Sequence, residues 1–69
     1  MIKVGQIYKV PCLRGKIAVT WIRADKLDFN VIRTDGFFFI CREPDSKWEL
    51  IAEYPTWQEA VNSKEFKGE

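Results

Sequence analysis

The chain has 69 residues, a length that accommodates one small domain with a single hydrophobic core. Its 11 basic and 10 acidic side chains give a net charge of +1, so total charge favours neither nucleic acid nor an acidic membrane as a partner. The chain contains no histidine, which excludes the catalytic and zinc sites that depend on an imidazole.

Five short strands followed by one helix are predicted along the chain. Residues 2–10 are rich in Val, Ile and Tyr, and Gly5 marks a bulge or bend within them. Further strands are predicted at 17–23, 27–33, 37–42 and 48–54, each bounded by turn signals. The pattern indicates a single α+β domain over residues 1–69: a small twisted antiparallel sheet of about five strands with one short C-terminal helix.

The segment KVGQIYKV at residues 3–10 resembles the first strand of SH3-like barrels, which often opens with the pattern V-G-x-x-Y/V. The resemblance covers eight residues of the 69. It implies a barrel-like curvature, so the sheet is expected to be partly rolled, and a fold of this kind does not by itself define a function.

The C-terminal helix begins at a capping box. Thr56 and Glu59 have the spacing at which the first hydroxyl and the later carboxylate satisfy backbone donors of the first turn. Trp57, Ala60 and Val61 then fall on one face of a helix of about two or three turns. Phe66 is expected to pin the tail.

The TDG segment at residues 34–36 connects the third and fourth strands, and its length decides which side chains share a face. A two-residue loop at 35–36 would place Phe38 and Ile40 on the face of Phe29. A three-residue loop with a left-handed Gly36 places Phe37 opposite Arg33 instead. We favour the longer loop because it gathers the apolar residues on one face and sets Arg42 opposite Asp28.

This register predicts a core face and a reverse face. The core face consists of Ile17, Val19, Trp21, Leu27, Phe29, Val31, Phe37, Phe39 and Cys41. The reverse face consists of Ala18, Thr20, Ile22, Asp28, Asn30, Ile32, Phe38, Ile40 and Arg42. The apolar centre of the reverse face is either covered by Trp57 and Val61 of the helix or left open to a partner.

The function expected from these features is that of a small non-catalytic protein-binding or regulatory module. An aromatic anchor within a polar rim is typical of protein interfaces, and free sheet edges favour strand addition or a homodimer. A protein partner or a second copy of the chain is therefore expected. The predicted protein-binding residues are Asp28, Ile32, Phe38, Ile40 and Arg42.

Binding of single-stranded DNA or RNA is the alternative function. A small sheet with basic side chains and an aromatic ring has the parts of a platform on which bases stack. The low net charge and the acidic second half of the chain weigh against it. The residues predicted for this alternative are Lys9, Arg14, Lys16, Trp21, Arg23 and Arg33.

Catalytic chemistry finds little support in the sequence. Cys12 and Cys41 are 29 positions apart, unlike the paired spacing of a metal or redox motif, and no orienting base accompanies either thiol. We therefore expect that the chain is not an enzyme and that it binds no cofactor, metal or small-molecule substrate. Without a signal-peptide pattern or an 18-residue apolar span, the chain is expected in the cytoplasm and away from membranes. Its length also permits an inhibitor encoded by a phage or mobile element.

Overall fold

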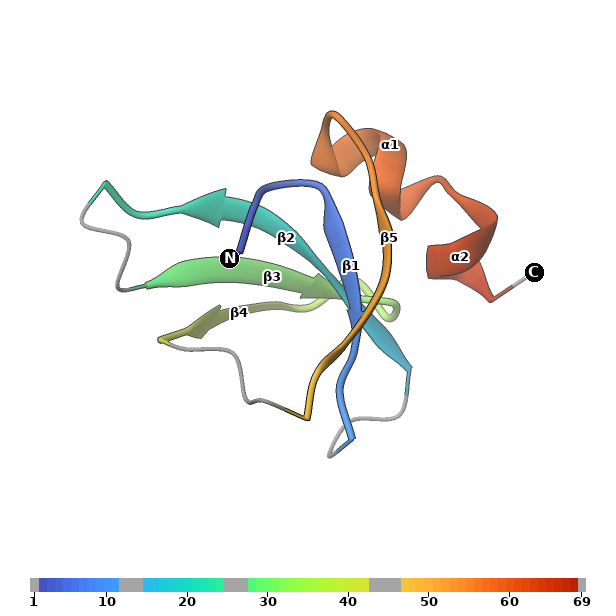
Figure 1. Cartoon of the computed structure of the whole chain (residues 1–69), viewed down its shortest axis with the longest axis horizontal. Coiled ribbons are helices and arrows are strands. Elements are labelled where there is room, and N and C mark those ends of the chain that lie inside the picture. Colours follow the sequence, from blue (N-terminus) through green and yellow to red (C-terminus); the bar gives the residue numbers. More distant parts are fainter. Residues whose placement is uncertain (1, 12–14, 25–27, 43–46, 69) are drawn as a thin grey trace.

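The computed structural model describes residues 2–11, 15–24, 28–42 and 47–68. Five antiparallel strands form one sheet in the order β4-β3-β2-β1-β5, and two short helices follow them (Figure 1). The strands are β1 (Gln6–Lys9), β2 (Lys16–Ile22), β3 (Phe29–Arg33), β4 (Phe38–Cys41) and β5 (Glu49–Glu53). The helices are α1 (Trp57–Val61) and α2 (Lys64–Lys67).

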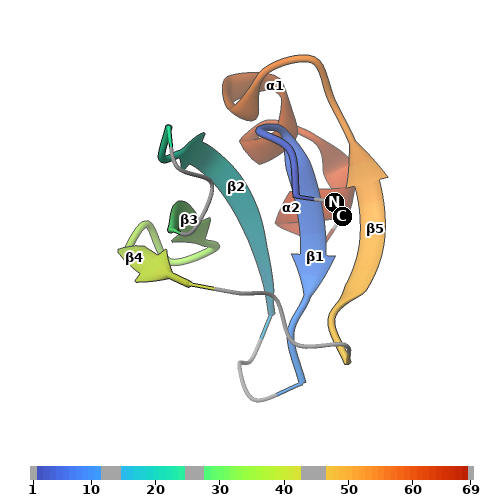
Figure 2. The same ribbon diagram turned by 60° about the vertical axis from the view of Figure 1, so that its left-hand side comes forward.

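The small antiparallel sheet is confirmed, and the fold is mostly β. The sheet is strongly curved but not closed into a barrel, because β4 and β5 form its two edges and do not pair with each other (Figure 2). Among the described residues, the strand order therefore leaves two edges whose outward backbone groups have no partner strand.

The described residues contain two helices where the sequence predicts one. Thr56 caps α1, its hydroxyl oxygen accepting the Glu59 N–H at 3.2 Å, as the capping box predicts. Ser63 then caps α2 in the same way, accepting the Phe66 N–H at 3.2 Å. Phe66 is buried, as predicted. Among the described residues, neither helix has the length and apolar character needed to cross a membrane.

The apolar side chains form two clusters, one on each face of the sheet. The helix-side face is covered by α1 and α2, and Ala60 and Phe66 pack there against Ile7 and Ala18. The helix-free face carries the larger cluster, and Trp48 packs its ring against Tyr8 and Phe29 with centroid distances of 5.7 and 6.0 Å. The buried members of that cluster are Tyr8, Val10, Ile17, Val19, Phe29 and Val31.

The register predicted for the β3–β4 hairpin is confirmed. Val31 lies opposite Phe39, and the Arg33 N–H donates to the Phe37 carbonyl at 2.8 Å. Gly36 has a φ of 91°, the left-handed conformation expected of the last loop residue. Asp35 supports the turn by accepting the Phe37 N–H at 3.2 Å.

The prediction that Phe37 and Phe39 form a core pair is wrong. Phe37 is 65% exposed and Phe39 is 40% exposed, although both lie on the same face as Val31. The physical reason is the strand order: β4 is an edge strand, and β5, the strand that a closed barrel would bring beside it, lies at the opposite edge.

The placement of Trp21 in the core is also wrong. The β2–β3 register shifts between Val19 and Trp21, so Trp21 lies opposite Asn30 while Ile22 lies opposite Phe29. This bulge exchanges the two faces, because one extra residue reverses the alternation of side chains. Ile22 therefore packs against the helix-free cluster, contrary to the prediction for it, and Trp21 is 52% exposed.

The fifth strand does not have one inward face. A second bulge, between Ile7 and Tyr8, divides its contacts between the two clusters. Ile51 and Ala52 pack on the helix-side cluster, and Leu50 is 50% exposed. The predicted core residue Leu27 lies outside the described residues.

Candidate functional site

Strand β4 and the residue before it expose apolar side chains on both faces of the sheet. Phe37 and Phe39 point to the helix-free face, and Phe38 and Ile40 point to the helix-side face. The exposed fractions are 65% for Phe37, 59% for Phe38, 40% for Phe39 and 76% for Ile40. A half-buried strand normally covers one face, so the exposure of both is the unusual feature. We call these four residues together with Trp21 the β4 patch.

The helix-side part of the β4 patch extends inward from the sheet edge. Trp21, Asn30 and Ile40 form one row across β2, β3 and β4, and Ala18, Ile32 and Phe38 form the next. The helices bury Ala18 and part of Ile32. The row that contains Trp21 and Ile40 retains two exposed apolar side chains.

Phe38 is in contact with the helix but is not covered by it, so neither of the two alternatives for the reverse face holds completely. Its ring meets Trp57 edge-on, with a centroid distance of 6.5 Å and an interplanar angle of 81°. An edge-to-face contact restricts the rotation of the Phe38 ring without covering its outer side. Trp57 thus holds Phe38 in place and leaves 59% of it exposed.

The helix-free part of the β4 patch borders an apolar pocket. The Arg33 guanidinium stacks over the Phe39 ring at 5.3 Å from its centroid, which fixes that ring beside the opening. The pocket has a volume of about 240 Å³. Phe39 and Cys41 line it from β4, Ile17 from β2 and Val31 from β3. Val10, which follows β1, and Trp48, which precedes β5, also line its wall.

In the part of the chain that the structure describes, no strand lies beside the outer edge of β4. The Phe37 carbonyl faces β3, because it accepts the Arg33 N–H. Since alternate residues of an antiparallel strand direct their N–H and C=O groups to opposite sides, Phe39 also faces β3, whereas Phe38 and Ile40 face outward. The free edge and the two exposed faces therefore coincide on the same residues.

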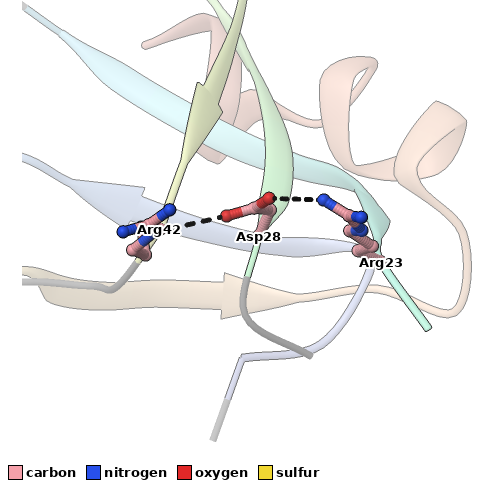
Figure 3. Close-up of polar contacts among 3 residues, drawn as sticks. All are labelled: Arg23, Asp28 and Arg42. Atoms are coloured by element: carbon pink, nitrogen blue, oxygen red, sulfur yellow. Dashed lines mark hydrogen bonds and ion pairs between the residues drawn. The ribbon is translucent and has the colours of Figure 1, made fainter. Parts of the chain in front are cut away.

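Asp28 forms the polar rim of this surface (Figure 3). Its carboxylate oxygens lie 3.7 Å from Arg42 Nε and 3.0 Å from Arg23 Nη1, so one acid bridges two arginines. The pairing of Asp28 with Arg42 follows from the predicted register. Arg23 was predicted only as a nucleic-acid contact, and its backbone N–H also donates to the Asp28 carbonyl at 2.9 Å. Arg42 is mostly exposed, so it remains available to a partner.

The basic residues predicted to bind nucleic acid are spread over the sheet. Arg33 forms an ion pair with Asp35, and the Lys16 ammonium donates to the Glu65 carbonyl. Lys9 lies between Lys16 on β2 and Glu49 on β5 in the strand register. Arg14 lies outside the described residues. Several positive charges of this set therefore already have acceptors within the chain.

Cys41 is a partly buried thiol in the wall of the pocket. Burial raises the pKa of the Cys41 thiol above its ordinary value, which keeps it protonated and poorly nucleophilic at neutral pH. Cys12 lies outside the described residues. In the described part of the chain no group of three or more His, Cys, Asp or Glu side chains has a metal-binding arrangement.

The sequence places Phe38 and Ile40 in the predicted protein-binding set, leaving open whether the helix covers them, and assigns Phe37 and Phe39 to the core. It predicts Trp21 as a core residue and as a nucleic-acid contact, but not as part of a protein-binding surface. The alternation pattern assigns faces but does not show which strand will lie at an edge. Comparisons with protein families, with curated proteins and with solved structures gave no significant match for this chain.

Proposed function

We propose that the chain is a small non-catalytic protein-binding or regulatory module that binds its partner through the β4 patch. The observation that carries the proposal is the exposure of Phe37, Phe38, Phe39 and Ile40 on both faces of an edge strand. From typical side-chain areas, these four residues expose roughly 450 Å² of apolar surface. That area is within the range of the largest apolar patches on small proteins, which often have a function.

Two further features of the surface support a binding role. Trp57 and Arg33 hold the rings of Phe38 and Phe39 in defined positions, so binding would cost little side-chain entropy. The Asp28–Arg42 pair lies at the end of the β4 patch, where a polar rim adds specificity. Rigid aromatic anchors beside a charged rim are a typical arrangement of residues in a protein interface.

Nucleic-acid binding has less support. Its affinity depends on clustered positive charge that displaces counterions from phosphates. Arg33 and Lys16 already contact acceptors within the chain, and the exposed Trp21 lies at the opposite end of β2 from Lys16. We therefore propose a protein as the partner.

Affinity capture from the native cell tests the proposed function. The bait variants are Ile40→Ser, inside the β4 patch, and Leu50→Ser, which alters an exposed apolar residue of β5 outside the patch. We expect the wild type and Leu50→Ser to retain the same proteins and Ile40→Ser to lose them, with all three unfolding at similar temperatures. Equal retention by the three baits would refute binding through the β4 patch.

A further inference from the structure

We propose that the partner at β4 is a second copy of this chain: two β4 strands pair antiparallel through their free edges, and Phe37 of each copy enters the apolar pocket of the other. The inference rests on the proposed function, because it names the partner of the same surface. It is argued from the edge, the register and the pocket of the described residues.

The choice of β4 over β5 follows from the side chains at the two edges. Charged residues on an edge strand discourage pairing with another chain. Strand β5 begins with Glu49 and ends with Glu53, both exposed. Strand β4 carries no charge and no proline between Phe38 and Cys41. Strand β4 therefore lacks the charges and prolines that discourage an edge strand from pairing with another chain.

Two-fold symmetry limits the register of such a pair. An axis normal to the sheet keeps every side chain on its own face, so a residue can oppose only one an even number of positions away. With Phe39 opposite its own copy, Phe38 lies opposite Ile40 and Phe37 lies opposite Cys41. The outward N–H and C=O groups of Phe38 and Ile40 are then those that bond across the interface. Each of these three kinds of opposed pair is apolar.

The neighbouring register that is shifted toward the C-terminal end of β4 is less favourable. With Ile40 opposite its own copy, Arg42 would lie opposite Phe38. This would place a guanidinium against an aromatic residue on the helix-side face and draw it away from Asp28. Pairing about Phe39 leaves the Asp28–Arg42 contact intact at the rim.

The pocket accommodates the Phe37 ring of the second copy. That residue lies opposite Cys41, which lines the pocket, and on the same helix-free face. The pocket volume is about 240 Å³, and an apolar cavity of about 150 Å³ is enough to bind benzene. The exposed Phe37 and the open pocket thus complete each other reciprocally, as an interface between identical copies requires.

The area available predicts a weak to moderate dimer. Two copies bring roughly 900 Å² from residues 37–40 alone, and the backbone and rim bring the total close to the roughly 1,200 Å² at which stable interfaces begin. Association is therefore expected in the micromolar range.

Sedimentation of the purified chain tests the pairing of the edges. We expect the mass to rise from 8.1 kDa to twice that value between about 1 and 200 μM. Ile40→Pro removes an outward N–H without touching the β3 ladder, so it should remain monomeric, whereas Ile40→Val should dimerise like the wild type. Phe37→Ala should raise the dissociation constant of the dimer at least tenfold, because it removes one anchor residue from each half of the interface. A wild type that stays monomeric, or a Pro variant that dimerises as well as Val, would overturn the proposal.

Cysteine cross-linking tests the register and does not depend on the proline variant. In a Cys12→Ser background, Phe37→Cys should form an intermolecular disulfide with Cys41 under oxidised glutathione, because non-bonded antiparallel pairs have Cα atoms about 4.5 Å apart. In Phe38→Cys the new thiol lies opposite Ile40 of the second copy, so this variant should give no covalent dimer. Equal cross-linking of the two variants, or none in either, contradicts the register.

The two proposals fail differently. A monomeric chain whose cellular partners are lost on Ile40→Ser would refute the second copy and leave binding through the β4 patch standing. A monomeric chain whose captured proteins do not depend on Ile40 would refute both.

Discussion

Gly5 lies where its backbone contacts two other segments of the chain. Its N–H donates to the Val19 carbonyl at 2.9 Å, and its carbonyl accepts the Tyr54 N–H at 3.0 Å. Its φ is 93°, and a Cβ at this position would approach the Tyr54 carbonyl oxygen to 2.1 Å. Only glycine fits a site with both a left-handed backbone and a close backbone neighbour.

Gly5→Ala is therefore predicted to destabilise the fold by at least about 2 kcal/mol, because strain and a backbone clash add together. Gly36→Ala is the matched control: its φ is 91°, but no atom of the described residues lies within 4 Å of the added Cβ. It should cost about 1 kcal/mol from strain alone. Urea unfolding measures both, and equal losses would show that the contact with Tyr54 is unimportant.

At this scale the sequence predicts what is local. The TDG loop and the alternation around it are enough to place Phe39 opposite Val31, because turn chemistry fixes the register of a hairpin. The bulge after Val19 has no glycine or proline to mark it. Thr20 donates its hydroxyl to the Asn30 carbonyl there, at 3.3 Å, and that contact exists only in the folded sheet.

At the scale of elements, α2 is held to the sheet by a few polar contacts around one buried ring. The Tyr54 hydroxyl donates to Glu65 Oε2 at 2.6 Å, and the Lys16 ammonium donates to the Glu65 carbonyl. Phe66 is the residue of α2 whose side chain is buried. A four-residue helix has little intrinsic stability, so these contacts keep it in place.

The Tyr54–Glu65 contact predicts a pH dependence of stability. The hydrogen bond from Tyr54 lowers the pKa of Glu65, so its contribution is complete above the ordinary pKa of 4.5 and is lost as the pH falls through the folded value. The same bond raises the pKa of Tyr54, so the contribution is also lost as the pH rises through a value above 10.0.

Tyr54→Phe should therefore reduce the free energy of unfolding most between these limits and least at either extreme. Denaturant unfolding across the pH range measures the difference between the two proteins. The Tyr54→Phe/Glu65→Gln double variant is the control, and it should show no further change in pH dependence. Parallel curves for the wild type and Tyr54→Phe would refute the linkage.

The order of the strands is the part of the fold that the sequence does not specify. Residues 37–41 are apolar without interruption, and such a run does not show whether the strand lies inside the sheet or at its edge. Whether β4 is covered depends on β5, which is distant in the sheet although next in sequence. For this reason the sequence predicts Phe37 and Phe39 as core residues, although both are exposed.

Across the whole molecule, the helices cover the middle of one face of the sheet, and the exposed apolar residues gather at the β4 end. The helices pack mainly on β2 and partly on β1, and Trp57 of α1 contacts Phe38, while β4 lies at one edge of the sheet (Figure 1). A chain of this size has too few residues outside the strands to cover both faces of a five-stranded sheet. The uncovered end contains the β4 patch, the pocket and the free edge, which is why we assign binding to it.

Amide hydrogen exchange at β4 tests this assignment most directly. In dilute solution the Phe39 amide, which faces β3, should be protected, while the outward Phe38 and Ile40 amides should exchange rapidly. Raising the concentration of the chain should protect Phe38 and Ile40 as the edge becomes paired. Exchange at these two amides that stays rapid at every concentration, and in the presence of the proteins captured from the cell, would contradict binding through β4.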